Sequence, residues 1–345
     1  MTVNLYDPRY MIKMVEKIPK VRTFFRDTFF KRVEISPTDK IEMDIRKGSR
    51  KMAPFVHERV GSEIDPNSGF ITKEFRPPLV SPGRLTTVDD ILHRMPGENM
   101  YEPTSPSERA MKKMRQDYID LENQITRREE WMCAQAICTG QIPVAGKSVN
   151  YVIDLDFTNK ETITTETQKW SDLANSDPLA DLDRWAKRVQ ITGFVNPNIV
   201  IMGSAAADYF MKNEKVLKVL DVKNVNLGLI APKELPNGAT YIGYLPKNNL
   251  SIYTYTEWAE DATGTPTPLV PDNAVIVAYS GEENVMGYAA ITIADMKNDT
   301  FVTYEKTRVP EQEMKQNPAR RFLYLHAKPL PIPAEVNSWF VANVA

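Results

Sequence analysis

The sequence has few cysteines and histidines, the residue types that most often form metal sites, nucleophilic sites and disulfide bonds. It contains two cysteines and three histidines in 345 residues. Cys133 and Cys138 match neither the spacing of metal ligands nor a disulfide framework, and two reduced core cysteines fit a reducing compartment. His57, His93 and His326 are widely separated, and none has a helical His or Cys partner. These absences argue against a zinc site and against a disulfide scaffold.

Long apolar runs and a surplus of positive charge are also missing. No apolar run approaches the roughly 20 residues that span a bilayer, and residues 1–14 lack the apolar centre of a signal peptide. The formal net charge is −2, whereas a dedicated nucleic-acid binder usually has a basic surplus. We therefore expect a protein without a membrane segment, made in the cytoplasm, with room only for weak or indirect contact with nucleic acid.

Motifs for catalysis are nearly absent. Ala145-Gly-Lys-Ser148 resembles the end of a phosphate-binding loop, but the full motif needs Gly where Gln141 stands, and a strand before it instead of a helix. Asp154 and Asp156 would share one face of a strand, where a paired-carboxylate site is conceivable and a solvated face is the commoner outcome. We predict no catalytic, cofactor-binding or metal-binding residues and no enzyme activity.

The strongest pattern present is one long helix over Ser105–Gly140. Ser105, Pro106 and Glu108 predict a capping box with proline at the first helical position, and Gly140 marks the end. At 1.5 Å per residue the helix would be about 50 Å long. Because that is long for a globular domain, we expect the helix to pack across another part of the protein. An apolar stripe at steps of three, four or seven is formed by Met111, Met114, Tyr118, Leu121, Ile125, Met132 and Ala136.

The other positions of this helix are mostly charged, with Glu129 and Glu130 among them. Pairs such as Lys113–Asp117 and Arg115–Glu122 predict a solvated face or a seam between subunits.

The residues before the helix predict an arm and an excursion. Four aromatic residues lie within seven positions: Phe24, Phe25, Phe29 and Phe30. So much apolar area on a short arm should dock on the protein's own domain or on a neighbouring subunit. Ile41–Ile45 and Ile71–Phe75 alternate as strands do, with a turn signal at Asp65–Gly69. They predict a two-stranded excursion that leans on a partner, because isolated hairpins are marginally stable.

The remainder predicts a mixed α/β lobe, so the fold class is α+β. Asp177-Pro178 opens a helix that Gly193 ends, and a helix from Ser204 to about Leu220 follows a buried strand at Ile199–Met202. The tail 328–333 is close to polyproline II. Later strands are predicted at Tyr241–Leu245, Leu250–Thr256, Ala274–Tyr279, Tyr288–Ile293, Phe301–Tyr304 and Phe322–Ala327.

The chain resembles the tailed-phage major capsid protein family typified by the lambda major head protein, which has the HK97-like fold. The similarity extends over nearly the whole length and rests on the order of elements. The segments that carry it are Phe24–Phe30, Thr38–Ile45, Ala53–Val56, Phe75–Pro78, Arg127–Ala136, Leu269–Val277 and Ala327–Pro333.

The resemblance implies a major capsid protein that self-assembles into hexamers and pentamers of an icosahedral shell around double-stranded DNA, contacted without sequence specificity. Portal, scaffolding and decoration proteins are expected partners, and the location is the virion, assembled in the host cytoplasm. The implied divisions are an N-terminal arm (1–37), an E-loop (38–95), a P domain (96–174) with its spine helix (105–140), an A domain (175–290) and a return to the P domain (291–345).

Within this family resemblance, thirteen residues are candidates for contacts between subunits, with contact inside their own domain as the open alternative. The docking anchors are Phe24, Phe25, Phe29 and Phe30; the apolar E-loop contacts are Met52, Phe55, Val56, Ile71 and Phe75; and the polar contacts are Arg46, Lys47, Arg50 and Lys51.

Some relatives with this fold cross-link neighbouring subunits through a Lys–Asn bond, and no motif here places such a Lys, Asn and catalytic Glu. We therefore expect no cross-link, and scaffolding from a separate protein, because the chain begins at Met without an acidic coiled-coil segment. The alternatives are an encapsulin-like compartment, distinguished by protein cargo in place of DNA, and an α/β enzyme, distinguished by a deep pocket with converging polar groups.

Overall fold

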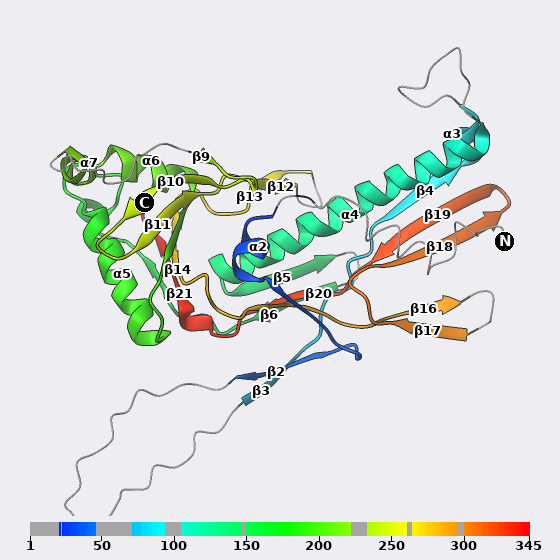
Figure 1. Ribbon diagram of the computed structural model, residues 1–345, viewed down its shortest axis with the longest axis horizontal. Coiled ribbons are helices and arrows are strands. Elements are labelled where there is room, and N and C mark those ends of the chain that lie inside the picture. The colour runs from blue at the N-terminus through cyan, green and yellow to red at the C-terminus, as the bar shows by residue number, and fades with distance from the viewer. Residues whose placement is uncertain are drawn as a thin grey trace, which may run out of the picture.

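The computed structural model describes residues 21, 23–45, 71–93, 105–146, 149–221, 233–260, 264–295 and 300–345. Within these residues the molecule has two parts: a mixed α/β lobe at one end, and the long helix α4, which runs from the lobe along a set of strands to the other end (Figure 1). The C-terminus lies in the lobe. Among these residues no helix is long and apolar enough to cross a membrane.

Helix α4, Pro106–Cys138, has ends fixed by local sequence. The Ser105 hydroxyl accepts a hydrogen bond from the Glu108 backbone N–H, and the Glu108 carboxylate accepts one from the Ser105 N–H at 3.0 Å, which confirms the predicted capping box. Gly140 follows the helix with φ +70°, and a Cβ there would collide with Phe157. The helix is therefore 33 residues long and cannot continue past this glycine.

The predicted apolar stripe of α4 is buried except at its start. Met114, Tyr118, Leu121, Ile125, Met132 and Ala136 are at most 6% exposed. Met111 was expected in the stripe but is 50% exposed, and it lies outside the core that the stripe forms with Leu323 and Leu325 of β19. Cys133 and Cys138 are buried free thiols, as expected, and burial raises the pKa of Cys138 to about 12.

One three-stranded antiparallel sheet, β18-β19-β4, lies along the first half of α4. Its core pairs Leu323 and Leu325 with the apolar stripe of the helix. The short helix α3, Val88–Leu92, follows β4 and packs near the start of α4. The strands are β18, Val309–Gln316, β19, Ala319–His326, and β4, Gly83–Thr87.

A second three-stranded sheet, β1-β15-β20, crosses the last half of α4. Strand β1, Arg32–Ile35, runs parallel to β15, Val285–Tyr288, which pairs antiparallel with β20, Pro329–Ile332. The tail predicted as polyproline II is thus a strand. Its prolines are tolerated because β20 is an edge strand.

The lobe is built on a seven-stranded mixed sheet of order β7-β21-β14-β8-β11-β10-β9. All residues of β8 and β14 are buried, because both faces of the sheet are covered. In sheet order the strands are Lys160–Thr162, Trp339–Asn343, Ala274–Ala278, Ile199–Met202, Leu250–Thr254, Thr240–Leu245 and Lys233–Glu234.

The two faces of this sheet contribute to different cores. Helices α5 (Pro178–Thr192), α6 (Ser204–Lys212) and α7 (Glu214–Asp221) cover one face, in a core that includes Trp185 and Phe340. The short helix α2 (Phe25–Phe29) and the end of α4 cover the other face. Two 3₁₀ turns, Glu166–Gln168 and Val336–Ser338, complete the lobe connections.

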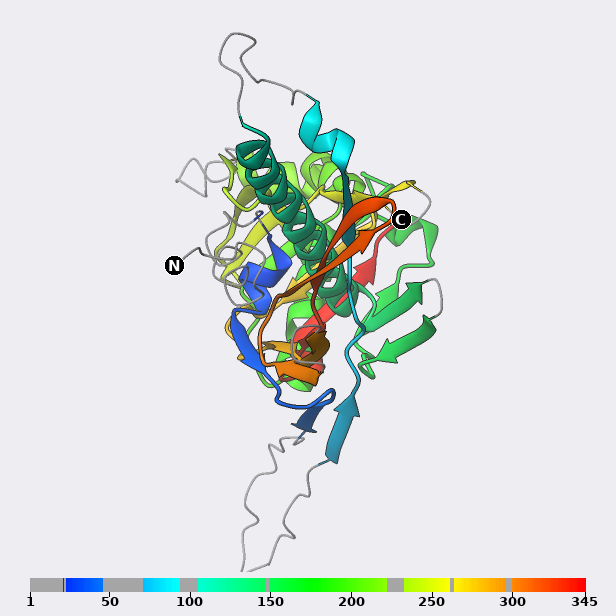
Figure 2. The same cartoon turned by 90° about the vertical axis from the view of Figure 1, so that its right-hand side faces the viewer.

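Four two-stranded hairpins extend this framework, none with a third strand among the described residues. Figure 2 shows β2 and β3 leading away from the body, paired from Ile41↔Phe75 to Ile45↔Ile71. This confirms the two strands predicted at the base of the excursion. The hairpins are β2–β3 (Ile41–Ile45, Ile71–Phe75), β5–β6 (Gln141–Gly146, Val149–Asp154), β12–β13 (Trp258–Glu260, Pro266–Pro268) and β16–β17 (Ile291–Asp295, Thr300–Tyr304).

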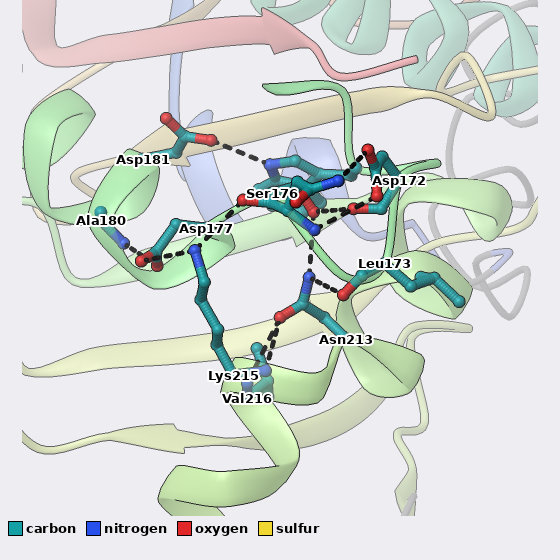
Figure 3. A network of polar contacts seen from close by, with 11 residues as sticks. Asp172, Leu173, Ser176, Asp177, Ala180, Asp181, Asn213, Lys215 and Val216 are labelled. Atoms are coloured by element: carbon teal, nitrogen blue, oxygen red, sulfur yellow. Dashed lines mark hydrogen bonds and ion pairs between the residues drawn. The ribbon is translucent and has the colours of Figure 1, made fainter. Parts of the chain in front are cut away.

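The single helix predicted over Ser204–Leu220 is wrong, because the chain breaks at Asn213 into α6 and α7 (Figure 3). The Asn213 side chain is buried and donates to the Leu173 carbonyl at 3.2 Å and the Ser176 hydroxyl at 2.9 Å. Its Oδ1 accepts from the backbone N–H of Lys215 at 2.9 Å. Asparagine therefore caps α7 and ties it to the loop before α5.

Two sequence divisions also differ from the structure. The strand predicted at Tyr288–Ile293 is interrupted at 289–290, and its halves enter different pairs, β15 and β16. Within the segment 291–345, which the resemblance assigns to the P domain, the last strand β21 lies in the lobe sheet, paired with β14 and β7. The backbone hydrogen bonds to β14 and β7 place this last strand in the lobe sheet.

Candidate functional site

Glu130 of α4 fixes the start of the short helix α2. Its carboxylate accepts hydrogen bonds from the backbone N–H groups of Phe24, Phe25 and Arg26 at 2.9, 2.7 and 3.0 Å, and from the Tyr255 hydroxyl at 3.1 Å. The first N–H groups of a helix have no partner inside it, and α2 has no cap from its own side chains. A buried carboxylate on a different helix therefore does the work of an N-cap.

Glu129, the preceding residue, joins a second set of buried groups. Arg308 donates to Glu129 at 2.7 Å and to Glu122 at 2.8 Å. Arg26 and the Tyr288 hydroxyl each donate to Glu129 at 2.8 Å. The side chains of Glu129 and Arg308 are 0% and 7% exposed. We use the name buried junction for Arg26, Glu122, Glu129, Glu130, Tyr255, Tyr288 and Arg308.

Charge in the buried junction is nearly but not fully balanced, with three carboxylates facing two guanidinium groups. Burial alone would lower the pKa of Arg308, but the charge and hydrogen bond of Glu129, together with Tyr288 and Glu122, raise that pKa overall. Burial raises the pKa of Glu130, and the hydrogen bonds from α2 and Tyr255 oppose the rise. Removing one partner from such a group leaves an uncompensated buried charge, so the junction tolerates single losses poorly.

The four phenylalanines predicted as docking anchors lie inside the subunit. Phe24, Phe25, Phe29 and Phe30 are 2, 0, 3 and 1% exposed. The rings of Phe24 and Phe25 pack on Tyr255 with centroids 5.1 and 5.5 Å away. This is the own-domain alternative of the sequence analysis. In this conformation the four side chains are not accessible to a neighbouring subunit, because the lobe and α4 enclose them.

Most of the predicted E-loop contacts lie outside the described residues. Phe75 is partly buried and packs, with Ile41, against the core below the lobe. Ile71 pairs with Ile45 at the outer end of the β2–β3 pair. The candidates outside the described residues, which stay predictions, are Arg46, Lys47, Arg50, Lys51, Met52, Phe55 and Val56.

The sequence analysis missed the buried junction. Glu129 and Glu130 were expected on a solvated face or a seam, yet both are at most 3% exposed. The Lys113–Asp117 pair forms at 3.2 Å, whereas Arg115 does not reach Glu122, which binds Arg308 instead. Arg308 is 179 residues from Glu129, so no local pattern links them. One sequence feature could have indicated that this part of α4 is buried: residues 131–138, directly after Glu130, include no charged residue.

One exposed surface is a shallow, open groove of about 630 Å³ along the outer side of α5, lined by residues of this helix alone. Ile191 is 72% exposed there, far more than an isolated isoleucine usually is in a folded protein. Arg184 is paired with Glu161 and Asp181 inside the subunit. The groove is lined by Ala180, Asp183, Arg184, Lys187, Arg188, Ile191 and Thr192.

A second exposed surface is the hairpin β12–β13. Trp258 is 57% exposed at its start, between the exposed carboxylates of Glu257 and Glu260. The Leu269 N–H donates to the Glu257 carbonyl at 2.9 Å and closes the base of the hairpin. In Figure 1 this hairpin and α5 lie on different sides of the lobe.

Among the described residues, the carboxylates and histidines considered for chemistry make local contacts. Strand β6 ends at Asp154, and Asp156 follows it with φ +57°, so the strand face that the two residues were expected to share does not form. His326 Nε2 lies 2.8 Å from Glu311 Oε2, and His93 Nδ1 lies 2.9 Å from the Asp89 carbonyl oxygen of α3. Across the described ranges no three His, Cys, Asp or Glu side chains are placed to hold a metal ion.

Comparison with known proteins gives one consistent family. The family model described as phage major capsid protein E matches residues 7–344. The P21 prophage-derived major head protein of Escherichia coli O6:H1 and the major capsid protein of Enterobacteria phage P21 are each 23% identical over 349 residues, covering 99% of this chain and 100% of the relative.

Two solved structures share the fold. The putative capsid protein of an E. coli CFT073 prophage superposes with a TM-score of 0.70 at 18% identity, covering 98% of this chain and 99% of the other. A phage-related protein of Bordetella bronchiseptica RB50 superposes with a TM-score of 0.57 at 10% identity, covering 99% and 97%.

Proposed function

The chain belongs to the phage major capsid protein E family, and from this premise we propose that it forms hexamers and pentamers of an icosahedral shell that packages double-stranded DNA. It is a major capsid protein of a phage, a structural component of the virion and not an enzyme. Its fold is the HK97-like fold that the sequence resemblance implied.

The observation that carries the proposal is the extent of the family match, which runs from residue 7 to residue 344 and so includes the arm, the excursion, α4 and the lobe. The architecture supports it. The β2–β3 pair leaves the body without a third strand among the described residues. Exposed strand edges and protruding hairpins supply main-chain pairing to neighbouring copies.

Many weak contacts of this kind suit shell growth, because each can be corrected before the sum becomes large. The partners we propose are further copies of the chain, together with portal, scaffolding and decoration proteins, and assembly takes place in the host cytoplasm. The packaged DNA is contacted weakly and without sequence specificity, because a net charge of −2 leaves no basic surplus to hold the phosphates.

Electron microscopy of the expressed full chain tests the proposal. Shells or capsomers are the expected result, and a stable compact monomer at high concentration would overturn it. Nuclease-protected DNA in the particles distinguishes a capsid from an encapsulin-like compartment, which would hold protein cargo.

A denaturing gel of mature particles tests the absence of covalent reinforcement. We expect a single band at the monomer mass of 39.3 kDa. Ladders that survive boiling would contradict it and would indicate a subunit cross-link.

A further inference from the structure

We infer that the β12–β13 hairpin of one subunit docks in the α5 groove of a second copy, so that neighbouring lobes join head to tail around a ring. The inference rests on the proposed function and adds to it a specific contact between lobes. The hairpin carries the exposed Trp258, and the groove carries the exposed Ile191.

The two surfaces complement each other in apolar character. Large aromatic side chains that enter a groove supply most of the free energy at many protein interfaces, and Trp258 is 57% exposed on a short, well-anchored hairpin. Ala180 and Ile191 give the groove its apolar surface. Covering both at once removes two exposed apolar side chains from water, and neither is covered within the described part of the subunit.

The two surfaces also complement each other in charge. In the groove, Arg184 is already held by Glu161 and Asp181, and Asp183 is held by Lys247. Lys187 is exposed and forms no ion pair within the described part of the chain.

Beside it, the Arg188 guanidinium lies over the Phe340 ring, 5.3 Å from its centroid. On the hairpin, Glu257 and Glu260 are exposed and likewise unpaired among the described residues. The groove thus carries two cations, one of them stacked on Phe340, and the hairpin carries two carboxylates. Such complementarity between two copies fixes the register of a contact and disfavours wrong partners.

The positions of the surfaces favour a ring. Helix α5 packs on β14 and β21, toward one edge of the lobe sheet, whereas β12 follows β11, toward the other edge. Figure 1 shows them on different sides of the lobe. A contact between two different patches is heterologous, and repeating it closes a ring when the rotation permits. A two-fold dimer would instead need one patch that complements itself.

The groove is also preformed, which lowers the entropy that docking must overcome. The Asp177 carboxylate caps α5 by accepting from Ala180 N–H at 3.1 Å, and the Lys215 ammonium lies 3.3 Å from Asp177 (Figure 3). On the buried side, the Trp185 indole donates to Glu161 at 3.1 Å. These bonds hold α5 in place before a neighbour arrives.

Charge reversal on each side tests the contact in the full-length chain. Lys187→Glu on the groove side, or Glu257→Lys with Glu260→Lys on the hairpin side, should raise the protein concentration needed for capsomers at least about tenfold, because like charges then meet. The combined variant should recover assembly. Native mass spectrometry measures the ring populations. Lys212→Glu is the control on the same lobe outside both surfaces, where the exposed pair with Asp208 contributes little to stability.

Mixing the two one-sided variants gives a sharper result. In an equal mixture, every favourable contact joins a groove-reversed subunit to a hairpin-reversed one, so subunits must alternate. Alternation is possible in a ring of six and impossible in a ring of five. We expect hexamers to return and pentamers to stay absent.

Trp258→Ala provides a test that does not depend on charge, with the more exposed Phe301→Ala as its control. We expect a loss of capsomers of about tenfold or more for Trp258→Ala and none for Phe301→Ala. The contact is refuted if the one-sided variants assemble like the unaltered chain, or if the combined variant does not recover. Failure of the unaltered chain to form any capsomer would instead overturn the proposed function.

Discussion

The first fifteen residues of α4 and its last eighteen have different surroundings. Three residues are buried in the first part and twelve in the second. The first part rests on one sheet, β18-β19-β4, and its outer side faces solvent. The second part is enclosed by α2, the lobe sheet and the β1-β15-β20 sheet.

This contrast shows how burial changes the meaning of a charged residue. In the first part, Asp120 pairs with Arg84 of β4 at 3.4 Å, and both side chains are 43% exposed. In the second part, Glu129 has no exposure and needs partners from α2, β15 and residue 308. The same residue types thus serve as surface charge in one half and as connections between distant segments in the other.

Breaking the helix where the two halves meet should have the largest effect. Leu121→Pro removes a backbone hydrogen bond and introduces a clash, at a cost of about 3 kcal/mol or more, and it also replaces a side chain with no exposure. We expect no folded, soluble protein, as judged by circular dichroism and sedimentation. Ser107→Pro, in the first turn where proline is tolerated, is the control. A folded Leu121→Pro variant would show that the halves are independent.

Removing one ion-pair partner from each half tests the comparison directly. Arg308→Met leaves Glu122 and Glu129 buried without their cation and should lower the free energy of unfolding by about 3–5 kcal/mol. Asp120→Asn in the first half should cost about 1 kcal/mol or less, because its pair with Arg84 is exposed. Urea denaturation measures both. Equal losses would contradict the contrast between the halves.

Truncating Glu130 should loosen α2 in particular. Glu130→Ala leaves three backbone N–H groups and the Tyr255 hydroxyl without an acceptor, at about 1–3 kcal/mol for each donor that water does not reach. Hydrogen exchange should increase at residues 24–26 before it increases elsewhere. Asp120→Ala, on the exposed side of the first half, is the matched control. Unchanged protection of residues 24–26 would argue against a capping role for Glu130.

Removing the N-cap of α4 should have the smallest effect, confined to the first half. Ser105→Ala should cost about 1 kcal/mol and increase exchange only in the first turn. The N–H and hydroxyl of Ser105 lower the pKa of Glu108 below 4.5. The stabilisation from ionised Glu108 is therefore present above pH 4.5 and is lost as the pH falls through the lowered value. If the hydrogen-exchange protection of the first turn in the unaltered protein did not fall on acidification, this prediction would be contradicted.

Features coded by neighbouring residues were predictable. Ser105 and Glu108 form their capping box, and Asp177 caps α5 by accepting from Ala180. The strand Ile199–Met202 was identified from its continuous apolar run, because a strand covered on both faces needs no polar side.

Features coded by distant residues were not predictable. Asn213 resembles any polar residue in a helical pattern, and its role depends on Leu173 and Ser176, about forty positions earlier. The buried junction depends on Arg308 in the same way. Residues 329–332 form a strand only because β15 offers them an edge.

The position of β21 has a consequence for when a subunit becomes usable. This strand lies between β7 and β14, and its Trp339 and Phe340 reach the cores on the two faces of the lobe sheet. A chain still held by the ribosome without residues 339–343 cannot complete that sheet, although α4 and the strands before it have been synthesised. The lobe sheet is therefore completed only after this segment has been translated, and until then Trp339 and Phe340 are missing from the two cores that flank the sheet.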